Sequence, residues 1–235
     1  MTLSEILLVG RNATATATAT MSNGQTQAVT SGWVSSATQV ATVTDAGVVR
    51  GVSNGTSAIS VTSGGHQASR TIRVAPDYDG RWSGVQIVTA CRDTLDLRGA
   101  CQEPEFAGVI GSAYPISLTA RQPGGLEVSG EFVVELMNYP TFTTNVEEDG
   151  TIRFSSTTEV DGVRGNVSWV MQSTISGRAS GSIVEKYTFP GLATGELIWE
   201  STFTDLPKGS AAAQAARTPE ARAQLLNRLR TALRR

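Results

Sequence analysis

Short runs of β-branched and apolar residues, separated by turn-forming residues, are the feature of this sequence that most constrains its fold. Within many runs, residues alternate in character with a period of two, as threonine and alanine do from Ala13 to Met21. A period of two is typical of a strand with one buried and one exposed face. The sequence therefore predicts an all-β protein, and its length allows two domains, each with its own core.

Residues 1–75 are predicted to form one small β-sandwich, because about seven short strands spaced by turns fit that fold. The informative runs are, in order, Trp33-Val34-Ser35-Ser36, Val40-Ala41-Thr42-Val43, Gly47-Val48-Val49, Gly55-Thr56-Ser57-Ala58-Ile59 and Arg70-Thr71-Ile72-Arg73-Val74. In order and spacing, these runs resemble the bacterial immunoglobulin-like domain, second group, of the invasin and intimin class of surface proteins. The resemblance implies a spacer or adhesive building block outside the cytoplasm, with Trp33 in the core. A sugar-binding role for Trp33 is the alternative.

The boundary between the domains is expected at residues 76–79. Pro76 interrupts a strand ladder, and the residues after it form turns. Asp77 and Asp79 offer two carboxylates to a calcium ion, but calcium takes six or more oxygen ligands. A plain turn is therefore the expectation.

Residues 80–206 form the second predicted domain, with longer strands. Val128 and Phe132 fall on one face of a strand, while Glu127 and Glu131 fall on the other. We expect about eight strands, near residues 81–89, 114–121, 126–137, 141–147, 151–159, 163–175, 181–188 and 194–204. Eight meandering strands close most easily into a barrel, which removes exposed edges. The fold class is therefore all-β, with a sandwich followed by an antiparallel up-and-down β-barrel.

Gly80-Arg81-Trp82 opens the second domain. A Gly-x-Trp in the first strand of an eight-stranded meander is similar to the calycin superfamily, the lipocalins and their relatives. The resemblance implies that Trp82 plugs one end of the barrel. The family often stacks a basic side chain from its last strand on this tryptophan. The expected last strand, Gly195 to Ser201, offers none.

The apolar lining of the barrel is the best functional clue in the sequence. An eight-stranded barrel is either filled by its own side chains or holds one small ligand. The residues predicted to line such a ligand site are Phe132, Val134, Phe154, Trp169, Met171, Tyr187 and Trp199. Spacing alone leaves two functions open. One is binding of a small apolar ligand inside the barrel, and the other is a solid barrel that contacts a surface partner through loops such as residues 91–113.

Neither catalysis nor a cofactor is indicated by the sequence, so we expect a non-enzymatic protein. The single histidine, His66, lies beside Gly64-Gly65 in a predicted hairpin, and the metal motifs are missing. Glu127, Glu131 and Glu135 share a strand face with about 13 Å between neighbours, too far apart for paired acid–base chemistry. Loop carboxylates that could surround a barrel mouth are Glu103, Glu105, Glu147, Glu148 and Asp149. The net charge of −2 gives no field that attracts nucleic acid.

Cys91 and Cys101 lie ten positions apart in one loop-like segment. We expect a disulfide there, worth about 2–3 kcal/mol, with two free thiols as the alternative. The sequence contains no stretch of about twenty apolar residues and no recognisable signal peptide. The expected location is extracytoplasmic: secreted, periplasmic or on the cell surface.

The C-terminal residues differ in character from the rest. Residues 207–217 are expected to be a flexible link, and residues 218–235 a basic amphipathic helix that begins with Thr218 as N-cap. Its apolar stripe consists of Leu225, Leu226, Leu229 and Leu233, and its basic residues are Arg222, Arg228, Arg230, Arg234 and Arg235. We expect this helix to dock on a domain or to fray. Contact with an anionic membrane surface is the alternative.

Overall fold

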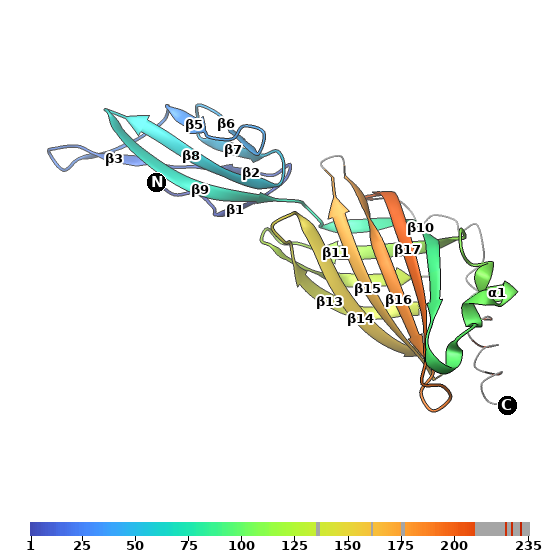
Figure 1. Ribbon diagram of the computed structural model, residues 1–235. Helices are drawn as coiled ribbons and strands as arrows, with labels where there is room; N and C mark the ends of the chain where they lie inside the picture. Colours follow the sequence, from blue (N-terminus) through green and yellow to red (C-terminus); the bar gives the residue numbers. More distant parts are fainter. Residues whose placement is uncertain are drawn as a thin grey trace.

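The computed structural model describes residues 1–134, 137–160, 162–174 and 177–209, together with Gln224, Asn227 and Thr231. It consists of two β domains joined end to end, as Figure 1 shows. β9 of the first domain leads through residues 76–79 into β10 of the second. The predicted all-β fold, with a sandwich followed by a barrel, is confirmed. The expectations for Thr218, the leucine stripe and the five arginines of the tail lie outside the described residues.

The first domain is a sandwich of small sheets. Its strands are β1 (Ile6–Leu8), β2 (Asn12–Thr14), β3 (Thr18–Thr20), β4 (Thr26–Ala28), β5 (Trp33–Ser35), β6 (Ala41–Val43), β7 (Val48–Gly51), β8 (Gly55–Ser63) and β9 (His66–Ala75). One sheet has the order β1-β9-β8-β5, with β1 parallel to β9, and another has the order β2-β7-β6. Trp33, Val49, Ile59 and Ile72 from these sheets share one core, so Trp33 is a core residue as expected.

The alternation from Ala13 to Met21 is divided between two sheets, which the sequence did not predict. Ala15 and Ala17 are buried, whereas Thr14, Thr16 and Thr18 are exposed, so the period of two is present. However, β2 pairs with β7, whereas β3 pairs with β4 in a separate two-stranded ribbon. The physical reason is that β7 begins at Val48, so its pairing with β2 ends at the hydrogen bond from Ala15 to Gly47, and the chain beyond pairs with β4.

The second domain is one antiparallel sheet of eight strands curved into a nearly closed barrel. Its strands are β10 (Gly80–Asp93), β11 (Ala113–Arg121), β12 (Glu127–Val134), β13 (Met137–Asn145), β14 (Thr151–Val160), β15 (Val163–Ser173), β16 (Arg178–Thr188) and β17 (Glu196–Pro207). The order is β13-β12-β11-β10-β17-β16-β15-β14, so the first and last strands of the domain, β10 and β17, are neighbours in the sheet. At the remaining seam, the Thr144 hydroxyl on β13 donates to the Arg153 carbonyl on β14 at 2.6 Å.

Several strand limits differ from those expected. β13 starts at Met137 rather than near residue 141, and β17 continues to Pro207 rather than ending near residue 204. Cys91 lies within β10 and not in a loop, because β10 runs on to Asp93 after a bulge between Val88 and Ala90. Glu135 lies outside the described residues.

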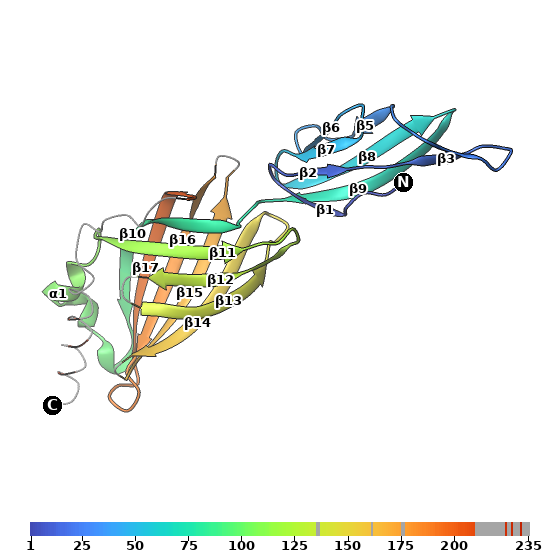
Figure 2. The same ribbon diagram turned by 180° about the vertical axis from the view of Figure 1, so that it is seen from behind.

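Short helices cover the end of the barrel that lies away from the first domain. The connection from β10 to β11 contains the 3-10 helices η1 (Leu95–Leu97) and η2 (Ala100–Gln102) and the helix α1 (Pro104–Ala107). Figures 1 and 2 both place α1 on the side opposite the first domain. We call this the distal end, and the end that meets the first domain the junction end. Among the described residues, no helix is long and apolar enough to span a membrane.

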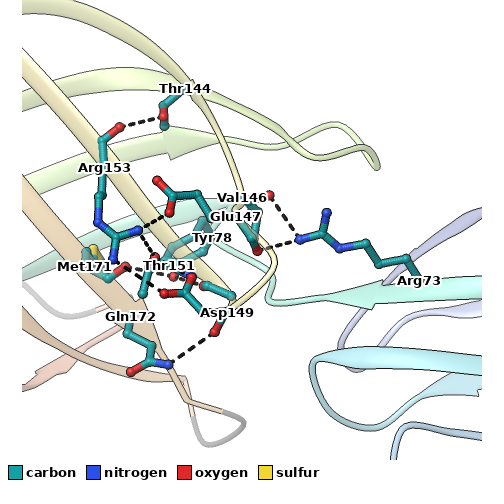
Figure 3. A network of polar contacts seen from close by, with 11 residues as sticks. Arg73, Tyr78, Thr144, Val146, Glu147, Asp149, Thr151, Arg153, Met171 and Gln172 are labelled. Carbon is teal, nitrogen blue, oxygen red and sulfur yellow. Dashed lines mark hydrogen bonds and ion pairs between the residues drawn. The ribbon is translucent and has the colours of Figure 1, made fainter.

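Polar contacts fix the first domain against the junction end. The Arg73 guanidinium on β9 donates to the carbonyls of Val146 and Glu147 in the β13–β14 hairpin, as Figure 3 shows. The Asn54 amide donates to the Glu148 carbonyl at 3.0 Å. Gly150 in that hairpin has a φ of +83°, and an added Cβ would lie 3.1 Å from both Asn54 and Pro76. The two domains are therefore held in direct contact.

Candidate functional site

The predicted ligand-lining residues all point inward, but they belong to two separate clusters. Phe132, Val134, Phe154, Trp169 and Met171 lie in a core that occupies the junction half of the barrel. Tyr187 and Trp199 lie in a second core, in the distal half, together with residues of η1, η2 and α1. The sequence placed these seven side chains around one site, whereas the structure divides them between two cores. Whether they bind a ligand stays a prediction.

Aromatic rings fill the junction half. The Phe132 ring centroid lies 5.6 Å from that of Trp169 and 5.1 Å from that of Phe154. The Trp169 centroid is also 5.4 Å from that of Phe203. Phe132 and Trp169 are each 1% exposed. Such contacts at 4.5–7 Å are favourable ring packing, and they leave this half of the barrel with a solid interior.

Trp82 lies at the junction end and is fully buried. Its indole N–H donates to the Tyr78 carbonyl at 2.9 Å, and the Lys208 ammonium lies 5.5 Å from its ring centroid. The expectation that no basic side chain reaches Trp82 was therefore wrong. The reason is the length of β17: the strand continues to Pro207, and Lys208 then bridges to Trp82. A cation over an indole face is attracted by the ring quadrupole.

The buried Tyr78 hydroxyl makes hydrogen bonds to backbone groups of the β13–β14 hairpin and of β15. It accepts a hydrogen bond from the Ser173 amide at 3.0 Å and has the carbonyls of Gly150 and Met171 within 2.7 and 3.1 Å. Burial raises the pKa of Tyr78 well above its usual value. Nearby, the Thr151 hydroxyl and amide hold the pKa of Asp149 below its ordinary value. The Tyr78 hydroxyl therefore joins β15 to the β13–β14 hairpin.

The distal half contains a buried polar cluster that sequence reasoning missed. Glu185 is 1% exposed and points inward from β16 between Ile183 and Tyr187. Its carboxylate accepts hydrogen bonds from the Gln86 amide at 3.1 Å and from the Tyr187 hydroxyl at 2.5 Å. Gln86 reaches it from β10 across β17, which is the strand between them. We call Glu185, Gln86, Tyr187 and Ser201 the interior polar cluster.

Two acceptors of the interior polar cluster lack hydrogen-bond partners. The Gln86 side-chain oxygen and the Ser201 hydroxyl are both inaccessible and unpartnered, and their residues are 0% and 1% exposed. A buried polar atom without a partner has a free-energy cost of about 1–3 kcal/mol. A period-two reading of Ile183, Glu185 and Tyr187 would have placed Glu185 inside the barrel. Gln86 gives a similar signal between Trp82 and Val88, and Ser201 gives one between Trp199 and Phe203.

The surface of the distal end is ordered and carries apolar side chains. Cys91 and Cys101 form the expected disulfide. The Asp96 carboxylate accepts hydrogen bonds from the amides of Thr194 and Gly195, which lower the pKa of Asp96. Leu95, which lies between Cys91 and Asp96 in the sequence, is 64% exposed. Its φ of +52° is a left-handed conformation that is uncommon for leucine. Ile110 is 47% exposed in the same connection.

A pocket of about 580 Å³ lies at the junction of the two domains. Residues from both domains line it, and they are Val9, Ser53, Asn54, Pro76, Asp77, Ser173, Thr174, Gly177 and Lys208. Its carboxylate, Asp77, lies 3.2 Å from Arg11 and 3.3 Å from Lys208. The Asp77 carboxylate also accepts from the Asp79 amide, as in a turn. The pocket is therefore lined by groups that hold the junction.

The remaining candidates lie apart from one another. His66 is exposed at a hairpin opposite Ser63, as expected. Glu147, Glu148 and Asp149 lie at the junction end, whereas Glu103 is exposed at the distal end. They therefore do not surround one barrel mouth. The side chain of Glu105 lies outside the described residues. In the part of the chain that the structure describes, no three His, Cys, Asp or Glu side chains gather as a metal site would require.

Comparison with known protein families finds one match, over residues 2–74, to the family described as Bacterial Ig-like domain (group 2). Domains of this family occur in bacterial surface proteins. The match and the disulfide together suggest an extracytoplasmic protein. No curated protein matches the chain.

Proposed function

We propose that this chain is a non-enzymatic surface protein, in which a fixed spacer domain presents the distal end of a solid barrel to a partner. Three features support the proposal. Residues 2–74 match a family found in surface proteins. Arg73 and Asn54 hold the spacer against the barrel. Aromatic side chains such as Trp169 fill the junction half.

The exposed Leu95 carries the proposal. An outward-pointing leucine in a left-handed conformation is unfavourable for the isolated protein, because it combines backbone strain with apolar exposure. The surrounding disulfide and the Asp96 hydrogen bonds hold it in place. Such a rigid apolar side chain loses little entropy on binding, so it suits the centre of a contact.

Attachment of protein-coated beads to a panel of cells and extracellular-matrix proteins tests this function. The double variant Leu95→Ser, Ile110→Ser is expected to lower attachment at least tenfold. The matched control is Val34→Ser, which removes a 59% exposed side chain from the spacer domain and should leave attachment unchanged. Attachment that survives the double variant would contradict the proposal, as would chain-coated beads that attach to no surface in the panel.

A second function, binding of a small ligand inside the barrel, is favoured by the interior polar cluster. The unpartnered oxygens of Gln86 and Ser201 lie in the same half of the barrel as the Glu185 carboxylate. These three groups together favour an occupant that donates hydrogen bonds, such as a small amine or a water molecule. The small apolar ligand expected from the sequence has no donor for them.

Native mass spectrometry separates the two functions. A small molecule that co-purifies with the chain and is lost in Glu185→Gln would support interior binding. A chain that carries no small molecule, and shows no thermal shift with ammonium or methylammonium ions, would leave contact through the distal end as the function. Leu95→Ser serves as the control, because it should not affect an interior occupant.

A further inference from the structure

The outer face of β10 and β11 is apolar where a barrel wall normally meets water. Val85 pairs with Pro115 and Ile87 with Ala113 across the two strands, and the residues between them point inward. Ile87 is 38% exposed. We call these four residues the β10–β11 outer face.

Three described residues of the C-terminal segment show which side of a helix faces water. Gln224, Asn227 and Thr231 are helical and exposed, and the Thr231 hydroxyl donates to the Asn227 carbonyl at 2.8 Å. At 3.6 residues per turn they fall within an arc of about 60°. The sequence places four leucines on an arc of about 100° centred on the opposite side. These are Leu225, Leu226, Leu229 and Leu233.

The described chain leaves the barrel beside the same strand. The Gly209 amide donates to the Arg81 carbonyl on β10 at 2.6 Å. Residues 210–217 can span up to about 26–29 Å. The distance along β10 from Arg81 to Ile87 is about 20 Å at the usual rise of a strand. A segment that begins at residue 218 therefore reaches the β10–β11 outer face without moving the barrel.

We propose that residues 218–235 of this same chain dock as a helix on the β10–β11 outer face, with the leucines against Ile87 and its neighbours. The contact joins three independent observations: the exposed apolar face, the exit of the chain beside Arg81, and the polar exposure of Gln224, Asn227 and Thr231 on the side away from the leucines. The docked helix covers a barrel wall that neither the spacer domain nor the distal end uses.

Hydrogen exchange of the backbone amides of residues 218–235, followed by mass spectrometry on the full chain, tests the proposal. Exchange is expected to be at least about tenfold slower than in a synthetic peptide of residues 210–235. Ile87→Glu should remove that protection, because it places a carboxylate under the leucines. The matched control Val34→Glu places the same charge on an exposed apolar site of the other domain and should change nothing.

A change in the docking segment itself keeps the test decisive should Ile87→Glu disturb the barrel. Leu229→Ser leaves the barrel unchanged and should weaken the protection about threefold. Three results would overturn the proposal: exchange in the chain as fast as in the peptide, protection that appears only with phosphatidylglycerol vesicles, or protection that grows with protein concentration. The second result would assign the leucines to a membrane surface and the third to a second copy of the chain.

Discussion

The two halves of the barrel close their interior by different means. At the junction end, aromatic rings pack together, and the Tyr78 hydroxyl and the Trp82 indole both find hydrogen-bond partners. At the distal end, a disulfide holds the cover, Gln86 and Ser201 keep unpartnered oxygens inside, and Leu95 projects into water. The Trp169 indole nitrogen in the junction half also lacks a partner, so the two halves differ in how they are covered and in the exposed leucine.

The contrast is the basis of the proposed contact through the distal end. Unpartnered buried acceptors and exposed leucine both lower stability, and they persist where a partner or ligand compensates. In the described chain, Leu95 and two such acceptors lie in the distal half, while the side-chain oxygen of Asn54 is a third at the junction. The junction half makes the hydrogen bonds that join the barrel to the first domain. Four stability experiments and one acid titration test this difference between the two halves of the barrel.

The largest effect is expected from Trp169→Ala in the junction half. The side chain is 1% exposed and packs on Phe132 and Phe203, so its removal should lower the free energy of unfolding of the barrel by about 3–5 kcal/mol. Urea denaturation followed by near-ultraviolet circular dichroism measures the change. Val34→Ala on the spacer surface is the control and should stay within about 0.5 kcal/mol. A loss below 1 kcal/mol for Trp169→Ala would show that this half is loosely packed.

Removal of the disulfide should loosen the distal half most. Cys91→Ser with Cys101→Ser is expected to lower stability by about 2–3 kcal/mol, because the unfolded chain gains loop entropy. Hydrogen exchange should quicken more in residues 94–112 than in residues 146–151 of the junction hairpin. Equal acceleration at both ends would mean that the two halves unfold as one unit.

Tyr78→Phe tests a buried hydroxyl that has partners. We expect a loss of about 1–3 kcal/mol at pH 7, since the Ser173 amide would lose its acceptor. The raised pKa adds a pH dependence. Above about pH 10 the unfolded tyrosine releases its proton and the folded one keeps it, so stability falls as pH rises. That decline should be smaller in the variant, as measured by urea midpoints between pH 8 and 11.

Ser201→Ala is the matched test of a buried hydroxyl without a partner. Its removal should raise the free energy of unfolding by about 1 kcal/mol, because the folded protein no longer buries a polar atom without a hydrogen-bond partner. Thermal unfolding of the purified chain provides the measurement. A destabilised variant would instead show that the hydroxyl holds an occupant, which supports the interior-ligand function.

The smallest effects are expected from Asp96→Asn and Asp149→Asn, one at each end. Both carboxyls have a pKa below the ordinary value of 3.8, because backbone amides bind Asp96 and the Thr151 hydroxyl binds Asp149. Each therefore adds stability above that value and loses it as pH falls through the lowered pKa. Melting temperatures of the variants should lie below the parent at pH 7 and approach it near pH 2. A difference that persists at pH 2 would indicate a steric effect of the amide.

Much of the fold was predictable, because the period of two sorts side chains by face. The pattern placed Phe132, Trp169 and Tyr187 inside the barrel, and all three are buried. Glu185 was not predicted to be buried because only apolar residues were assigned to the interior. Its position on β16 has the same phase as Tyr187. The contact of Lys208 with Trp82 was not predicted because the end of β17 depends on pairing with β16. Local composition does not encode that pairing.

The contacts between domains and the division of the interior could not have been predicted. The hydrogen bonds of Arg73 to the β13–β14 hairpin join residues more than seventy positions apart. Whether Trp199 packs beside Trp169 or with Phe106 depends on how far each strand rises along the barrel and on the bulges in β10 and β16. Those quantities follow from closure of the whole sheet and not from any single run.

The parallel pairing of β1 with β9 determines how the molecule would respond to a pulling force. Ile6, Leu7 and Leu8 run beside Arg73, Val74 and Ala75, and β9 leads directly into the barrel. A force applied between the residues before β1 and the barrel acts along these strands in opposite directions. It therefore loads their backbone hydrogen bonds together, in shear, instead of opening them one at a time. A spacer built this way transmits tension to the barrel before it yields.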